Sequence, residues 1–306
     1  MPPATRRPSV RTTTVRTPSP KTRKPGTTRL ASVSAIQRPT IVIEPESLQD
    51  FNESINWCIY GDSGVGKTVL SSFAPNAYFL STEKGVVAAK RVGSQAKVIR
   101  APDWEHVEEA IKWANENLGR KHWLIVDSVS KMQELLILWW LRVQNAENAT
   151  RDIDVPQLQD HQKWQRMFLR FINDLVNAEY NVIFIATSMH KEDPEGDSIV
   201  LPNIVGKDYT ISNNFCADMD ILSCLRVKKR QNIDDPREAI LINDTFPPYM
   251  AKDRFHVLRR WEAIPDGDEE DGYFDIISDM IGDIMALSPE ERKAAKAAVT
   301  SPAANR

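Results

Sequence analysis

The chain has 306 residues, 42% hydrophobic and 26% charged, with a formal net charge of -3, a composition typical of a soluble globular protein whose core folds without disulfides or metals. Its three cysteines show no CxxC spacing, so we expect neither a disulfide framework nor structural zinc. No apolar run approaches the roughly 20 residues of a membrane span, and the start lacks the apolar segment of a secretory signal, so we expect a soluble, cytoplasmic protein without a membrane partner.

The first 40 residues differ in composition from all the others. They carry nine Lys or Arg and no acidic residue, together with seven Pro and thirteen Ser or Thr, whereas the remaining residues have a net charge of -12. Such a segment buries too little apolar surface to offset its ordering entropy, which predicts a disordered basic arm over residues 1–40. The arm can tether nucleic acid by neutralising phosphates. The alternatives are a solvated extension without a partner and a mitochondrial transit peptide, although prolines interrupt the amphipathic helix that a transit peptide needs.

Beyond residue 40, strand-like and helix-like segments alternate. The expected strands are short apolar runs at Ile55–Tyr60, Tyr78–Ser81, Lys97–Ala101, Trp123–Val126 and Val182–Ala186. The expected helices are Lys67–Phe73, Trp104–Leu118, Lys131–Val143 and His161–Glu179. Strands that are apolar along their length are typical of a parallel sheet with helices on both faces, so the alternation predicts an α/β fold with a mostly parallel central sheet.

The pattern changes after residue 220. Ile221–Val227 and Ala239–Ile242 are expected to pair as C-terminal antiparallel strands. An acidic turn at Asp266–Asp271, a helix over Tyr273–Leu287 and a frayed tail from residue 294 are expected to follow. This organisation divides the chain into the arm, a core over residues 41–262 and a C-terminal segment over residues 263–306.

The strongest motif is a phosphate-binding loop of the form GxxxxGK[ST]. It directly follows the first expected strand and directly precedes a helix, which is the context that this motif requires. Its residues are Gly61, Asp62, Ser63, Gly64, Val65, Gly66, Lys67 and Thr68. The glycines let backbone N–H groups surround phosphates, Lys67 is expected to reach the β- and γ-phosphates, and the Thr68 hydroxyl is expected to ligate Mg²⁺. The sequence therefore predicts a site for ATP and Mg²⁺.

Two acidic residues lie at the ends of expected strands. Asp127 ends the apolar run from Trp123, where a carboxylate can hold the metal; capping of the next helix is the alternative role. Glu83 follows the strand Tyr78–Ser81, where it can orient and deprotonate the attacking water; an exposed glutamate at a strand end is also common.

A third polar cluster, Thr187-Ser188-Met189-His190, follows the strand Val182–Ala186. At the end of a buried strand it can contact the γ-phosphate and report its loss. A lone histidine is more often a surface or hydrogen-bonded side chain, so the residues alone leave the role of His190 open.

Together these residues resemble the RecA core, and specifically the compact RecA-like P-loop ATPases, with an AAA-type ATP-binding domain, that phages encode for recombination and single-strand annealing. The resemblance covers about residues 53–260. It implies that Glu83 is the catalytic glutamate and that Asp127 ends the Walker B strand. It also implies that Ser188 and His190 belong to the γ-phosphate sensor.

The same family has basic residues on a late strand that reach the nucleotide of a neighbouring subunit, and Lys252 and Arg254 resemble them. Because they are two residues apart, they share one face of a strand. The alternative is a solvated basic strand edge. If these residues act in trans, the protein self-associates into a ring or a filament.

The resemblance implies an Mg²⁺-dependent ATPase that acts on single-stranded DNA in phage recombination, annealing or replication, in the cytoplasm of the bacterial host. The loops that contact DNA in RecA correspond to about residues 145–160 and 191–207 here, and both are acidic. The arm and Lys228–Arg230 are therefore the better candidates for phosphate contacts. Two alternatives stay open: a helicase-loader-like or motor ATPase with a protein or duplex-DNA partner, and a non-hydrolysing nucleotide-binding module that tethers DNA through its arm.

Overall fold

The computed structural model describes residues 54–148, 150–152, 155–192, 195–206, 210–228, 232, 238–264, 270–285 and 290. All of them belong to the unit Phe51–Arg306. The basic arm and the tail from residue 294 lie outside the described residues, as does most of the acidic turn.

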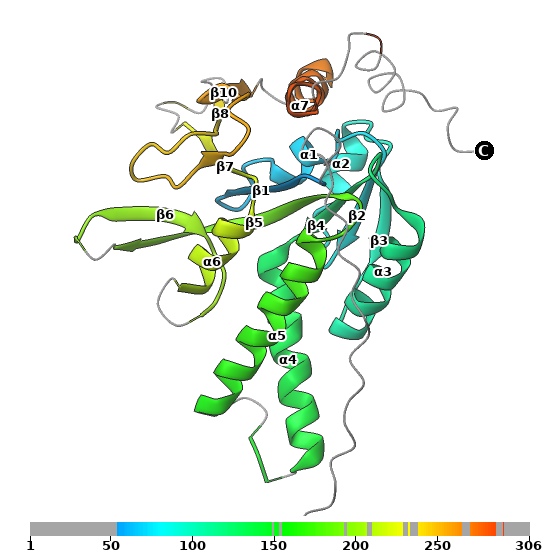
Figure 1. Ribbon diagram of the computed structural model, residues 1–306, viewed down its shortest axis with the longest axis vertical. Helices are drawn as coiled ribbons and strands as arrows, with labels where there is room; N and C mark the ends of the chain where they lie inside the picture. Colours follow the sequence, from blue (N-terminus) through cyan, green and yellow to red (C-terminus); the bar gives the residue numbers. More distant parts are fainter. Residues whose placement is uncertain are drawn as a thin grey trace, which may run out of the picture. The chain divides into compact units, whose positions relative to one another are not determined.

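A central sheet organises this unit (Figure 1). Its strands are β1 (Asn56–Gly61), β2 (Ala77–Ser81), β3 (Lys97–Arg100), β4 (Trp123–Asp127), β5 (Asn181–Glu192), β6 (Ser198–Pro202), β7 (Ile221–Val227), β8 (Ala239–Ile242), β9 (Lys252–Asp253) and β10 (Trp261–Ile264). The order across the sheet is β10-β8-β7-β1-β5-β4-β2-β3, and every pair from β7 to β3 is parallel. The strands β8 and β10 extend it in antiparallel fashion, while β6 pairs with β5 and β9 with β7.

Helices cover both faces of the parallel part. They are α1 (Lys67–Ser71), α2 (Val87–Arg91), α3 (Trp104–Asn117), α4 (Val129–Glu147), α5 (Leu158–Val176), α6 (Thr210–Asp218) and α7 (Glu270–Ile284). Alternate residues of β1 serve the two cores: Cys58 packs with buried residues of α3, α4, α5 and α6, and Trp57 packs with buried residues of α1 and α7. Because both faces are buried, every residue of β1 is buried, as its apolar sequence predicts.

The predicted fold class is confirmed: an α/β fold with a mostly parallel central sheet, helices on both faces and antiparallel C-terminal strands. One strand boundary is wrong in a way that affects the site. The strand expected to end at Ala186 continues to Glu192 and forms a hairpin with β6, which projects beyond the sheet (Figure 1). The polar residues after Ala186 are paired with β6, so they extend the strand instead of ending it.

Candidate nucleotide-binding site

The carboxyl ends of four parallel strands meet at one edge of the sheet. Gly61 of β1 is opposite Thr187 of β5, Asp127 of β4 is opposite Ile185 of β5, and Ser81 of β2 is opposite Asp127. This register places the phosphate-binding loop, the polar residues of β5, Asp127 and the segment after Ser81 at the same edge. Motifs that lie up to about 120 residues apart in the sequence therefore surround one space.

The phosphate-binding loop has the backbone that its glycines permit. Gly64 and Gly66 have φ values of 78° and 105°, which other residues rarely adopt. A Cβ at Gly61 would lie 2.2 Å from the Leu225 carbonyl oxygen, so this position has no room for a side chain. The loop ends at α1, whose first residue is Lys67.

The Lys67 side chain is buried at the base of the loop. Its Nζ donates to the carbonyl oxygens of Gly61, at 2.8 Å, and Asp62, at 2.7 Å. Burial lowers the pKa of Lys67, and the nearby carboxylates of Asp127, Asp62 and Glu83 oppose that shift. Two backbone carbonyls thus hold an ammonium group in the position from which a phosphate-binding lysine acts.

Thr68 and Asp127 form the next pair. The Thr68 Oγ1 donates to Asp127 Oδ2 at 3.0 Å, so a hydroxyl and a carboxylate oxygen lie side by side. Burial raises the pKa of Asp127 to about 6, and repulsion from Glu83 adds to this, while the Thr68 hydrogen bond and Lys67 oppose it. A buried carboxylate whose charge is only partly compensated is well suited to a cation.

Glu83 reaches the same site through Ser128. The Ser128 Oγ donates to Glu83 Oε1 at 2.6 Å and also accepts the backbone N–H of Lys131 at 3.2 Å, which caps α4. The backbone N–H of Ser128 donates to Thr82 Oγ1 at 3.1 Å, which ties the two strand ends together. The sequence motif Asp127-Ser128 signals the helix cap, but the contact with Glu83 depends on the spatial order of β2 and β4.

These residues line a cavity of about 380 Å³. Its walls include Gly64, Lys67, Thr68, Glu83, Asp127, Ser128 and Thr187. A Cβ at Gly85, which the sequence motifs do not identify, would lie 3.6 Å from Asp127 Oδ2 and 3.7 Å from Thr68 Oγ1, so this glycine keeps the space beside that pair open. The described residues contain no group of three or more His, Cys, Asp or Glu that holds a metal by itself. One hydroxyl and one carboxylate beside a phosphate-binding loop do fit Mg²⁺ bound together with nucleotide phosphates.

The polar residues of β5 divide into two groups. Thr187 lines the cavity, and Ser188 donates from Oγ to Asp62 Oδ1, which links β5 to the phosphate-binding loop. His190 lies further along the hairpin, opposite Val200 of β6; it is exposed and does not line the cavity. Ser188 is therefore in contact with the loop, and His190 is not.

Lys252 and Arg254 lie at the opposite end of the parallel strands. Lys252 begins β9, which pairs with the first residues of β7, and Arg254 directly follows β9. Lys252 Nζ donates to the carbonyl oxygens of Cys216, at 2.8 Å, and Ala217, at 3.1 Å, and Arg254 Nη1 pairs with Asp220 Oδ1 at 2.6 Å. Neither residue lines the cavity of its own chain.

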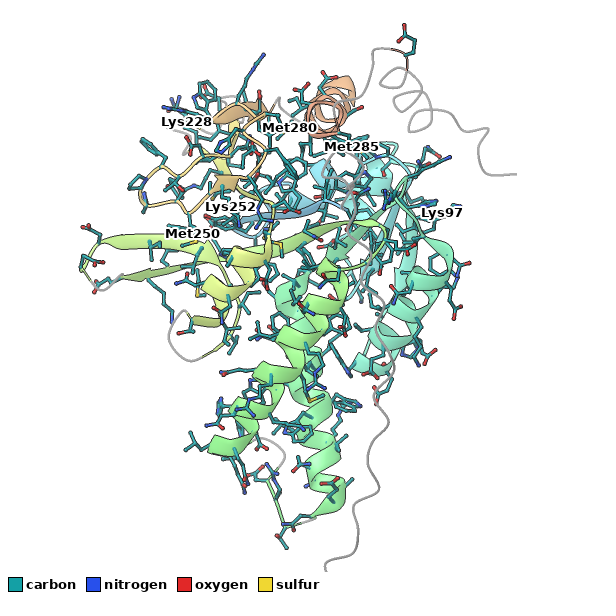
Figure 2. The ribbon with its side chains drawn as sticks, viewed as in Figure 1. Lys97, Lys228, Met250, Lys252, Met280 and Met285 are labelled. Carbon is teal, nitrogen blue, oxygen red and sulfur yellow. The ribbon has the colours of Figure 1, made fainter. Side chains whose placement is uncertain are left out.

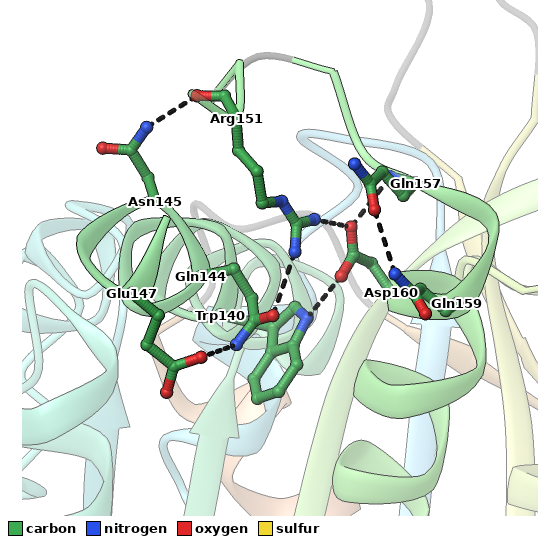
Figure 3. Close-up of polar contacts among 8 residues, drawn as sticks. All are labelled: Trp140, Gln144, Asn145, Glu147, Arg151, Gln157, Gln159 and Asp160. Atoms are coloured by element: carbon green, nitrogen blue, oxygen red, sulfur yellow. Dashed lines mark hydrogen bonds and ion pairs between the residues drawn. The ribbon is translucent and has the colours of Figure 1, made fainter. Parts of the chain in front are cut away.

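The first acidic loop is closed by its own side chains. Arg151 pairs with Asp160 and donates to Gln144 Oε1 at 2.9 Å, and the Trp140 Nε1 donates to Asp160 Oδ1 at 3.0 Å (Figure 3). The guanidinium of Arg151 is therefore engaged inside the chain, in line with the expectation that this loop does not contact phosphates. Lys228 pairs with Glu238 at 2.8 Å, and residues 229 and 230 lie outside the described residues.

A profile of the AAA domain family matches residues 53–255, which is well over half of the chain. The chain belongs to this AAA domain family. With the complete phosphate-binding loop in its predicted strand–loop–helix context, the AAA domain is a nucleotide-binding P-loop ATPase domain. No curated protein matches the sequence.

Among solved structures, the ATPase domain of another protein aligns with the AAA domain at a TM-score of 0.35 and 10% identity, over 66% of this chain and 78% of that chain. We transfer no property from a similarity at this level. None of the helices in the described part of the chain has the length and apolar character of a membrane span.

Proposed function

We propose that this AAA domain binds ATP with Mg²⁺ in the cavity at the carboxyl edge of the sheet and hydrolyses ATP to ADP and phosphate. The observation that carries the proposal is the arrangement of two pairs in one cavity: Thr68 with Asp127, and Glu83 with Ser128, both open to the space that Lys67 borders. One pair fits a cation, and the other fits a positioned base.

Each side chain has a distinct task in this proposal. Lys67 turns from its two carbonyl partners to the β- and γ-phosphates, and Thr68 and Asp127 hold the metal. Mg²⁺, when bound, neutralises charge on the phosphate oxygens. Glu83 accepts a proton from the attacking water, and Ser128 holds its carboxylate in place. Ser188, through Asp62, senses whether the loop holds a γ-phosphate.

We further propose that hydrolysis is coupled to single-stranded DNA, in recombination, annealing or replication of a phage genome in the host cytoplasm. The support is the resemblance of the motif set to phage RecA-like ATPases. Lys252 and Arg254 lie away from the cavity of their own chain, which favours a role at the nucleotide of a neighbouring copy in a ring or filament.

Steady-state ATP hydrolysis with and without Mg²⁺ and single-stranded DNA tests this proposal, with Lys67→Ala as the control for contaminating activity. We expect Mg²⁺-dependent turnover that single strands stimulate and that the variant lacks. Turnover that ignores all DNA would redirect the search to a protein partner, and turnover stimulated only by duplex would favour a motor. Nucleotide binding without any turnover would leave the non-hydrolysing tether.

A further inference from the structure

One face of the C-terminal strands has no covering element among the described residues. On the other face of β7, β8 and β10, residues such as Leu241 and Ile264 are buried against α7, where Met280 faces the strands (Figure 2). On the uncovered face, the register aligns Ile242 with Trp261. Trp261 is nevertheless 59% exposed and Ile240 is 37% exposed. Large apolar side chains gathered on one sheet face without a cover indicate a binding surface.

A cavity of about 590 Å³ lies on this face, larger than the nucleotide cavity. The segment after β8 forms its second wall and contributes Phe246, which is 67% exposed, and Tyr249. Its lining is mainly apolar and aromatic: Ile240, Ile242, Phe246, Tyr249 and Trp261, with Arg260 at the rim. We call this set the aromatic pocket.

Arginines stand beside the rings of the aromatic pocket. The Arg226 guanidinium lies over the Tyr249 ring, 4.7 Å from its centroid, and also donates to the Tyr249 hydroxyl. The Arg260 side chain is 87% exposed, and its closest acidic partner is Asp244, at 3.4 Å. The pocket thus presents flat apolar surfaces and planar cations together, and only a weak surface ion pair restrains Arg260.

The occupant must offer flat faces to the rings and negative charge to the arginines. An unpaired nucleotide offers both in one unit, because its base stacks and its phosphate is charged. Duplex DNA hides its base faces by stacking. The acidic β5–β6 hairpin of a second copy of this chain would supply charge, but His190 is its one ring among residues 187–202.

We propose that the aromatic pocket binds unpaired bases of single-stranded nucleic acid by stacking on Trp261 and Phe246. This inference rests on the proposed function, because it names the surface that contacts the single-stranded partner. Acidic neighbours offset much of the local positive charge, so stacking supplies most of the affinity here. Contacts to phosphates are left mainly to other basic segments.

The test measures binding of a labelled oligo-dT to the full chain by fluorescence anisotropy, with a non-hydrolysable ATP analogue present. Trp261→Ala and Phe246→Ala should each weaken binding roughly 5- to 150-fold, the range expected for loss of one stacked base. Trp261→Phe should retain most of the affinity. Trp113→Ala, which removes a 38% exposed tryptophan of α3, is the matched control and should bind like the wild type.

Salt dependence separates stacking from charge. The slope of log K against log salt should stay the same in Trp261→Ala, and Arg260→Ala should reduce it by about 0.7 if Arg260 contacts one phosphate. Cross-linking of an iodouracil-substituted oligonucleotide should map to peptides that contain Phe246 or Trp261. Basal hydrolysis without DNA should not change in any of these variants, because none of the substituted residues lines the nucleotide cavity.

Three outcomes would overturn the inference. Wild-type affinity in both alanine variants, or cross-links elsewhere, would reject the pocket and leave the single-stranded partner intact. A loss of affinity that accompanies dissociation of an oligomer in sedimentation would make this face an interface between copies. Failure of the wild-type chain to bind any oligonucleotide would instead reject the DNA partner, and this inference with it, while Mg²⁺-dependent hydrolysis could still stand.

Discussion

The nucleotide cavity and the outer end of the α4–α5 pair each contain a buried aspartate, and the two are treated in opposite ways. Asp160 accepts hydrogen bonds from the Gln157 backbone N–H, at 2.8 Å, and from Trp140, and it pairs with Arg151 (Figure 3). Burial would raise the pKa of Asp160, but these donors together lower it. Asp127 has one side-chain donor, Thr68, and its pKa rises to about 6.

The difference shows which polar cluster is complete within the chain. At Asp160 the chain supplies every donor that a buried carboxylate needs, so the cluster fastens α5 to the segment before it. At Asp127 the compensation is partial, and the carboxylate borders an open cavity. Carboxylates with raised pKa values in a cavity are candidates for function, because a ligand can supply what the chain does not.

The largest expected effect separates chemistry from folding at the cavity. Glu83→Gln keeps the shape of the side chain and removes its ability to accept a proton, so turnover should fall about 10²- to 10⁴-fold. Nucleotide affinity should stay close to that of the wild type. Single-turnover hydrolysis and equilibrium nucleotide binding measure the two effects. Glu134→Gln, at an exposed glutamate of α4, is the control, and equal losses in both variants would contradict the role of Glu83.

The next effect concerns stability alone. Asp160→Ala leaves the Arg151 guanidinium buried without its carboxylate, which should lower the free energy of unfolding by about 3–5 kcal/mol. Urea unfolding measures this, with Asp174→Ala at an exposed position of α5 as the control. Hydrolysis per folded molecule should not change at low temperature. A fall in activity without loss of stability would show that the network serves the site.

The pH dependence of stability should reverse between the two aspartates. In the absence of Mg²⁺ and nucleotide, folded Asp127 keeps its proton up to about pH 6, whereas the unfolded carboxyl loses it near pH 4. Folding stability therefore falls as pH rises through this window, by about 3 kcal/mol at most for two pKa units. Asp160 has a lowered pKa, so its contribution is lost only as pH falls below about 4.

Unfolding of wild type and Asp127→Asn at pH 4 and pH 7 measures the first effect. The variant should match the wild type near pH 4 and be the more stable protein at pH 7. A stability difference that does not change with pH would contradict the raised pKa of Asp127.

The sequence predicts the cavity better than its surroundings, for physical reasons. Apolar runs that end in Gly61 or Asp127 mark buried parallel strands, and the carboxyl ends of such strands share an edge. The hairpin beyond Ala186 is not predicted, because its residues mix polar and apolar types. Lys252 could be placed on a strand, but the pairing of that strand with the start of β7 depends on tertiary contacts. Trp261 gives no sequence signal that its ring stays exposed.

The smallest effect expected concerns Ser128, which serves both the fold and the site. Ser128→Ala removes the N-cap of α4 and the hydrogen bond to Glu83, so it should cost about 1 kcal/mol of stability and slow turnover up to about tenfold. Ser128→Asp separates the two roles, because aspartate is a good N-cap but its charge repels Glu83. This variant should unfold like the wild type and turn over even more slowly than Ser128→Ala. If Ser128→Asp instead restores turnover, Ser128 acts only through the helix cap, and the position of Glu83 must be set by the Thr82 bridge between the two strand ends.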